Sequence, residues 1–208
     1  MKKIVFTIAL GLGLLTANAQ IQELSGPRIG VTFISSGTAA DFVHEGISSL
    51  DNEANQIGKT GSATITQYGW QWESRFADGG NVTGIVEWIA LVGGMEKGYF
   101  LPSVSSMVGL RTDKGLEFAV GPNLSFGGIA MVFGAGYNFK FGKLNVPVNI
   151  AYVPSMNKTY NHEEKYDYVE LYDEDGNDIG YEVVTPKYSV IHPTGARISV
   201  MLGFNLSK

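Results

Sequence analysis

The residues best suited to catalysis are three histidines, His44, His162 and His192, in segments that also offer serine and aspartate. A Ser/His/acid arrangement would support hydrolysis or acyl transfer, but its side chains must lie within hydrogen-bond reach of one another. The sequence has no nucleophile elbow, no zinc-ligand spacing and no phosphate-binding glycine loop that would assemble such a site. We therefore expect no catalytic residues and no cofactor, with a lipid hydrolase or acyltransferase as an alternative.

An acidic turn is the candidate metal site. Asp173, Asp175 and Asn177 have the two-residue spacing of the first ligands of a calcium loop. The EF-hand pattern also needs glycine at its sixth position and glutamate at its twelfth, but here Gly176 is fourth and Val184 is twelfth. We interpret the turn as solvated, with no metal ligands, and keep calcium binding as an alternative.

The elements that position the candidate histidines and acidic residues are strands. The evidence is that apolar and polar residues alternate with period two through most of the chain. Residues 82–93 fit least well, since Ile85, Ile89 and Leu91 fall on the otherwise polar face. The alternation predicts an all-β protein with eight strands, over residues 28–33, 67–76, 82–93, 103–111, 116–124, 129–141, 144–153 and 196–206.

The connections between these strands alternate in length. Three are short, glycine-containing turns, at residues 78–80, 113–115 and 142–143. The others, at residues 36–63, 94–101, 125–128 and 154–188, include two long loops. Short turns at one end and long loops at the other are typical of an antiparallel up-and-down transmembrane barrel whose termini lie at the short-turn end. The short-turn lengths also predict that Arg111 faces Glu117 and that Phe141 faces Leu144.

The chain begins with the pattern of a secretory signal peptide. Lys2 and Lys3 precede an apolar run, and Ala17-Asn18-Ala19 has small residues where a signal peptidase cleaves. We predict a signal peptide over 1–19, cleavage before Gln20, and one domain over 20–208.

The absence of cysteine excludes a disulfide framework and a lipoprotein anchored through cysteine. The negative charge of −5 argues against nucleic acid as a partner.

Composition decides which face of the barrel points outward. The exterior of a soluble barrel carries roughly 25–35% charged residues, whereas the polar face here consists mainly of Gly, Ser, Asn and Ala. Such small residues suit the narrow lumen of an eight-stranded barrel, which we expect side chains to fill, unlike the open channel of a porin. The scattered charges on this face are predicted to form ion pairs in the lumen: Arg28, Glu73, Arg75, Glu87, Arg111, Glu117, Lys140 and Arg197.

Aromatic residues on the apolar face gather toward the two ends of the strands. Two aromatic belts at the two membrane interfaces are typical of transmembrane barrels. We expect one belt near the long loops, Phe33, Tyr68, Trp70 and Tyr152, and one near the short turns, Phe76, Phe118, Phe139, Phe141 and Phe204.

Together with the signal peptide and the short turns, the final strand, ending in Phe204-Asn205-Leu206, resembles the small outer-membrane barrels of the OmpA/OmpX type. This resemblance implies a location in the cell outer membrane of a Gram-negative bacterium, contact with outer-membrane lipid, and insertion by the barrel-assembly machinery. The chain departs from the usual terminal signal, because Met201 stands where glycine is common and Lys208 replaces a terminal aromatic residue.

Two loops carry further structure. Apolar residues at three- and four-residue spacing predict an amphipathic helix over 38–57, in the first long loop. Strand-like runs on both sides of the acidic turn predict a β-hairpin over 165–185.

We expect a non-enzymatic barrel that is structural or binds an unknown surface ligand through its long loops. The alternatives are small-molecule or ion transport, a lipid-modifying enzyme and a soluble lipocalin-like carrier.

Overall fold

A computed structural model describes residues 24–46, 49, 58–172 and 174–206. The predicted signal peptide at 1–19, its cleavage site and residues 47–48 and 50–57 of the predicted helix lie outside these described residues.

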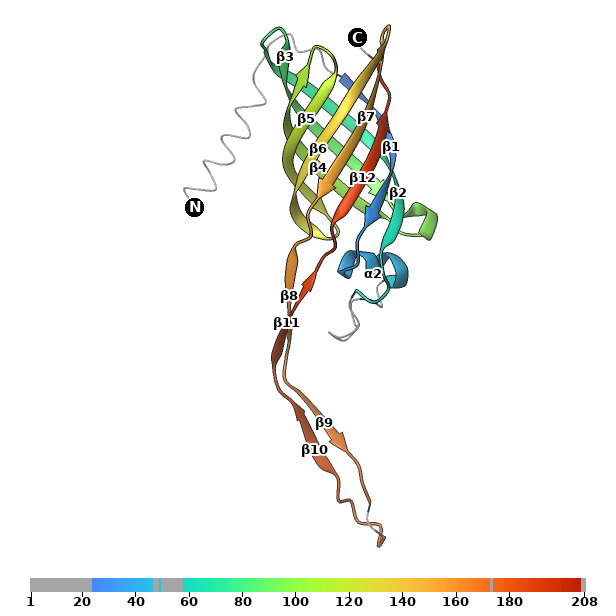
Figure 1. The fold of residues 1–208 in the computed structure, drawn as a ribbon. Helices are drawn as coiled ribbons and strands as arrows, with labels where there is room; N and C mark the ends of the chain where they lie inside the picture. The colour runs from blue at the N-terminus through green and yellow to red at the C-terminus, as the bar shows by residue number, and fades with distance from the viewer. Residues whose placement is uncertain (1–23, 47–48, 50–57, 173, 207–208) are drawn as a thin grey trace.

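The described chain folds into a closed antiparallel β-barrel (Figure 1). The strands from β1 (Leu24–Ile34) to β7 (Leu144–Val153) pair in chain order, and β1 closes the barrel by pairing with both β2 (Ala63–Asp78) and β12 (Arg197–Gly203). β12 and β13 are two parts of one final stave, so the predicted eight-stranded up-and-down barrel is confirmed. The staves are β1 (Leu24–Ile34), β2 (Ala63–Asp78), β3 (Val82–Gly93), β4 (Leu101–Thr112), β5 (Leu116–Ser125), β6 (Gly128–Phe141), β7 (Leu144–Val153), and β12 (Arg197–Gly203) with β13 (Asn205–Leu206).

The strand register agrees with the predicted second and third turns, whereas the first turn lies at 79–81, one residue later than predicted, and is preceded by a register shift in β2. Arg111 is opposite Glu117, and Phe141 is opposite Leu144. Three short turns join β2 to β3, β4 to β5 and β6 to β7, and each contains a glycine with positive φ: Gly80, Gly115 and Gly142. These turns define the short-turn end of the barrel, and the opposite end is the long-loop end.

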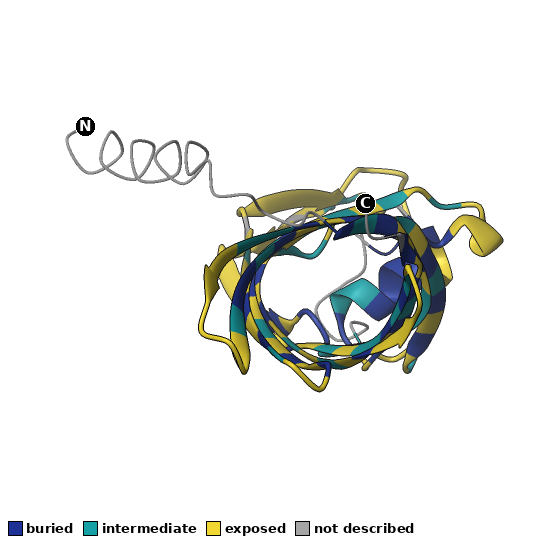
Figure 2. Ribbon diagram, turned by 90° about the horizontal axis from the view of Figure 1, so that it is seen from above, coloured by how far each residue is buried: buried dark blue, intermediate teal, exposed yellow. Residues whose placement is uncertain are grey.

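A short helix, α2 (Thr38–Glu45), follows β1 at the long-loop end. It confirms the start of the helix predicted over 38–57, but the helix ends at Glu45 because Gly46 adopts φ 67°. Viewed along the barrel, α2 lies across the opening (Figure 2). A 3₁₀ turn, η3 (Met95–Lys97), lies in the next long connection. No helix of the described residues is long and apolar enough to cross a bilayer.

The last long connection is an extended two-stranded ribbon that projects from the long-loop end (Figure 1). Its part next to the barrel pairs β8 (Asn157–His162) with β11 (Tyr188–Pro193). Its outer part pairs β9 (Lys165–Val169) with β10 (Tyr181–Thr185), which confirms the predicted hairpin over 165–185. The sequence did not predict the β8–β11 pairing.

The irregular alternation of residues 82–93 reflects apolar side chains on the inward face of β3. The register between β2 and β3 shifts between Arg75 and Ala77, next to Ile85. Ile85 is completely buried, so an apolar side chain fills this part of the lumen. Ile89 and Leu91 pair with Gln71 and Gly69, away from the bulge, and also line the lumen. The inward face of β3 is therefore mixed, polar at Glu87 and apolar on both sides of it.

Candidate functional site

The outer wall of the barrel is apolar and exposed. On β6, Ile129 and Phe133 are 67% and 50% exposed, whereas Val132 and Asn138, on the opposite face, are each 3% exposed. Along the other barrel strands, exposed and buried residues also alternate, shown in yellow and dark blue in Figure 2. Apolar side chains therefore point outward and polar ones inward, the reverse of a lipocalin-like soluble barrel.

Every residue of the two predicted aromatic belts lies on this exposed wall: Phe33, Tyr68, Trp70, Tyr152, Phe76, Phe118, Phe139, Phe141 and Phe204. Other exposed aromatic residues lie between the two ends. Trp72 and Trp88 are directly opposite each other near the middle of β2 and β3, and Phe133 lies near the middle of β6. Aromatic side chains thus cover the middle of the wall as well as its ends.

Inside the lumen, Arg111 binds two glutamates. Its Nη1 donates to Oε1 of Glu73 at 2.6 Å, its Nη2 contacts the other oxygen of the same carboxylate, and its Nε donates to Oε1 of Glu117 at 2.5 Å. All three side chains are at most 5% exposed. Glu117 is the cross-strand neighbour of Arg111 on β5, whereas Glu73 reaches it from β2. One guanidinium therefore joins three staves through charged hydrogen bonds.

Arg28 is held by neutral groups. Its Nε donates to Oε1 of Gln71 and its Nη1 to Oδ1 of Asn205, both at 2.8 Å. Gln71 in turn donates from Nε2 to Oε1 of Glu87 at 2.6 Å. Gly203 makes room for this network, because a Cβ there would lie 1.7 Å from Nη1 of Arg28. The sequence does not mark Gln71, Asn205 or Gly203 as members of a lumen network, because none of them is charged.

The remaining predicted lumen residues lie apart from this layer. Arg197 donates to Oγ of Ser125 at 2.6 Å and to Oδ1 of Asn123 at 3.4 Å, nearer the long-loop end. Arg75 is half-buried, and Lys140 is exposed close to a short turn. Among the described residues, the ion pairs of the lumen form at Arg111 alone.

Side chains do not fill the lumen completely. A cavity of about 90 Å³ lies inside the barrel, with Arg28, Gln71 and Glu87 among its polar lining and Met107 and Met201 among its apolar lining. The expectation of a filled lumen is therefore wrong, and the small inward residues explain why: Ala119, Gly134, Gly136 and Ala151 also line this space. A cavity of this volume has room for several water molecules.

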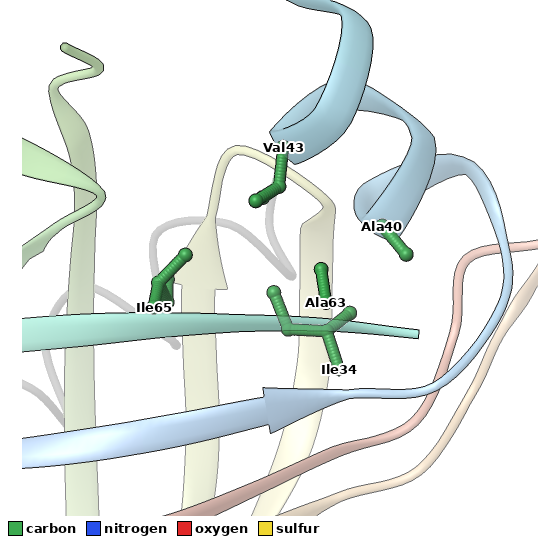
Figure 3. Packing of buried hydrophobic residues seen from close by; sticks show 5 residues of the cluster. All are labelled: Ile34, Ala40, Val43, Ala63 and Ile65. Atoms are coloured by element: carbon green, nitrogen blue, oxygen red, sulfur yellow. The ribbon is translucent and has the colours of Figure 1, made fainter. Parts of the chain in front are cut away.

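The helix α2 packs over the long-loop end of the lumen. Ala40 and Val43 contact a buried apolar cluster completed by Ile34, Ala63 and Ile65 (Figure 3). The carboxylate of Asp41, 2% exposed, accepts hydrogen bonds from the backbone N–H of Gly58, at 2.6 Å, and from the hydroxyl of Thr60.

Aromatic contacts extend this cover. The ring of Phe42 packs against Tyr99 and Phe126, with ring centroids 5.6 and 4.2 Å apart. Because these rings come from the two neighbouring long-loop connections, α2 holds three connections together over the lumen.

The candidate catalytic and metal-binding residues are dispersed. Nε2 of His44 lies 3.1 Å from the backbone oxygen of Ser62, and the ring of His192 packs against Tyr160. Neither contact is the nucleophile–base hydrogen bond that hydrolysis or acyl transfer needs. The side chain of His162 and all of Asp173 lie outside the described residues. Within the described part of the chain, no three His, Asp or Glu side chains are grouped to hold a metal ion.

The ribbon carries exposed aromatic and acidic side chains. Tyr166, Tyr168 and Tyr181 are 58%, 58% and 55% exposed. Oη of Tyr166 donates to Oε2 of Glu164 at 2.8 Å, and this hydrogen bond raises the pKa of the phenol. The ion pair between Lys187 and Glu163, at 2.8 Å, is also exposed.

Comparisons of this chain with protein-family models, with curated proteins and with solved structures found no match. The functional conclusions therefore depend on the geometry of the outer wall, the lumen and the ribbon.

Proposed function

We propose that this protein is a non-enzymatic outer-membrane β-barrel that anchors surface loops for binding. The observation that carries the proposal is the orientation of the two faces, with an exposed apolar wall outside and buried charges inside. Monomeric soluble proteins rarely expose contiguous apolar patches larger than a few hundred Å². A bilayer would remove this wall from water, and the closed strand pairing leaves no edge unpaired in the wall.

The dimensions of the staves support the same proposal. The strands from β1 to β7 have 10 to 16 residues. A tilted transmembrane strand needs about 9–11 residues. Each of these strands is thus long enough to cross the hydrocarbon layer, and several would extend beyond it.

In this proposal the short turns face the periplasm, and α2 and the ribbon face the outside of the cell. The predicted signal peptide supplies export. The barrel-assembly machinery would insert the chain, and outer-membrane lipid would surround the apolar wall. The surface ligand would bind at the long-loop end, where the ribbon places exposed aromatic side chains in reach of a partner.

Membrane fractionation and gel mobility test the proposal. We expect the full-length protein, expressed in a Gram-negative host, to appear in the outer-membrane fraction and to migrate differently in detergent gels before and after boiling. A monomeric protein that stays soluble without detergent after export would contradict it.

Passage of a small solute through the lumen is the second candidate, favoured by the cavity of about 90 Å³. α2 lies across the long-loop end of the barrel (Figure 2), where Ala40 and Val43 pack in the apolar cluster. We expect no conductance from the wild-type protein in a planar bilayer. Discrete conductance steps after Val43→Asp, which places a charge in the apolar cluster, would support passage, and a silent variant that retains heat-modifiable mobility would count against it.

A further inference from the structure

The ribbon differs in charge from the rest of the molecule. Residues 157–193 contain nine acidic residues and three lysines, which gives a net charge of −6 with histidines neutral. The whole chain has a net charge of −5, and Lys2 and Lys3 of the predicted signal peptide contribute +2 to it, so residues 20–208 carry −7 and their part outside the ribbon sums to −1. Net negative charge is therefore concentrated on the one element that projects farthest from the barrel (Figure 1).

The ribbon also exposes apolar surface on both of its faces. Tyr166, Tyr168 and Val184 share one face by strand alternation, and Tyr181 and Val183 share the other. Each of these five side chains is at least 38% exposed. Tyrosine supplies a large apolar contact area with a hydrogen-bonding tip and loses little conformational entropy when bound.

The barrel does not cover this part of the ribbon. β9 pairs with β10 alone, and no element among the described residues forms a third strand or packs a layer on them. An isolated two-stranded hairpin is only marginally stable in water. A partner that covers the tyrosines would therefore stabilise the ribbon as well as bind it.

We propose that the β9–β10 part of the ribbon is a docking site for a protein with a cationic surface that has apolar patches between its charges. Charge complementarity selects this occupant: a second copy of the ribbon, an acidic protein or an anionic polymer would add negative charge beside a segment of charge −6. The exposed tyrosines supply the apolar contact, and the surrounding carboxylates attract the partner and fix its orientation.

Labelled peptides of defined charge test the inference on the full-length chain in nonionic detergent. One probe repeats Lys-Tyr-Lys-Ser, a second repeats Glu-Tyr-Glu-Ser, and a third repeats Lys-Ser-Lys-Ser. Binding is followed by fluorescence anisotropy, and empty micelles serve as the blank. We expect the first probe to bind at least about tenfold more tightly than the second, and to weaken several-fold as salt rises from about 50 to about 300 mM. We expect the third to bind more weakly than the first, because it lacks aromatic contact.

Matched charge variants assign the binding to the ribbon. Glu170→Gln with Glu174→Gln removes two exposed charges from the ribbon, and Asp78→Asn with Asp113→Asn removes two from the short turns. We expect the ribbon pair to weaken binding of the Lys-Tyr-Lys-Ser probe about three- to tenfold and the turn pair to leave it unchanged. Equal effects of the two pairs, or equal binding of the Lys and Glu probes, would overturn the inference.

The inference depends on the proposed function only in placing the ribbon outside the cell. Because the peptide assay is done in detergent and the proposed function is tested by fractionation and gel mobility, the two can fail separately. If the protein shows heat-modifiable mobility but does not bind the Lys-Tyr-Lys-Ser probe, the docking site is overturned and the proposed membrane barrel is not. A soluble chain that binds the probe would contradict the membrane barrel and support the docking site.

Discussion

The lumen and the ribbon use the same kinds of charged residue in opposite ways. In the lumen, Glu73 and Glu117 are buried, and the guanidinium of Arg111 is the partner of both carboxylates. On the ribbon, acidic side chains such as Glu170 and Glu174 are exposed and outnumber the lysines. Buried charges must find partners within the fold, whereas exposed ones retain their solvation and can attract a partner from outside.

This difference separates stability from recognition. The lumen charges connect β2, β4 and β5, so changing them should alter the free energy of unfolding of the barrel. The ribbon lies outside the barrel sheet, so changing it should leave that free energy nearly constant and alter binding. The four predictions that follow test this separation.

The largest effect is expected from Arg111→Ala. The substitution leaves Glu73 and Glu117 buried without their cation. Breaking a buried pair by removing one partner costs about 3–5 kcal/mol. Urea unfolding of the barrel reconstituted in liposomes measures the loss, and heat-modifiable mobility reports whether the barrel still forms. An unfolding free energy equal to that of the wild type would show that the lumen charges do not stabilise the barrel.

A charge placed on the outer wall should have the next largest effect. Val108, in the middle of β4 and 55% exposed, becomes a cation on the proposed lipid face in Val108→Arg. An arginine near the midplane of the bilayer costs about 2–4 kcal/mol in a transmembrane barrel. The matched control is Ile191→Arg on β11, where the side chain is 62% exposed outside the barrel sheet. Comparable unfolding free energies for both variants would argue that the wall does not face lipid.

Strand alternation and turn length predict which residues share a face and which are neighbours across a hairpin. The pairing of Arg111 with Glu117 follows from a three-residue turn, and the structure has that register. The contact of Arg111 with Glu73 does not follow, because β2 and β4 are separated by β3 in the sheet. Which side chains meet across a lumen depends on the stagger and tilt of the strands, and an alternating pattern does not contain these.

The bridging role of Gln71 is a second lumen contact that the sequence pattern does not predict. The sequence predicts that Arg28 and Glu87 form ion pairs in the lumen, and both side chains are buried there. The structure inserts the amide of Gln71 between them, donating to one and accepting from the other. An amide on the polar face has no feature in the sequence that distinguishes it from other small polar residues, so its position in the network requires coordinates.

Gly203→Ala is expected to have an intermediate effect, because it crowds the Arg28 network without removing a charge. The added Cβ would lie 1.7 Å from Nη1 of Arg28, so the guanidinium must move away from Asn205. Overpacking of this kind costs about 1–3 kcal/mol. The control is Gly127→Ala, where the nearest atom beyond the adjacent residues, Oγ of Ser125, is 3.7 Å from the new Cβ. If the two variants unfold at the same urea concentration, close packing at Gly203 does not fix Arg28.

The smallest effect is expected from Lys187→Ala, which removes one partner of an ion pair as Arg111→Ala does. Lys187 and Glu163 are 2.8 Å apart, but their side chains are 60% and 76% exposed. Exposed ion pairs contribute about 0–1 kcal/mol, because water and salt screen them and each side chain loses entropy on pairing. We therefore expect an unfolding free energy of the barrel within error of the wild type. Removing Lys187 also makes the ribbon more negative, so binding of the Lys-Tyr-Lys-Ser probe should become slightly tighter. A large loss of barrel stability would show that the ribbon and the barrel unfold as one unit, and the separation between stability and recognition would then fail.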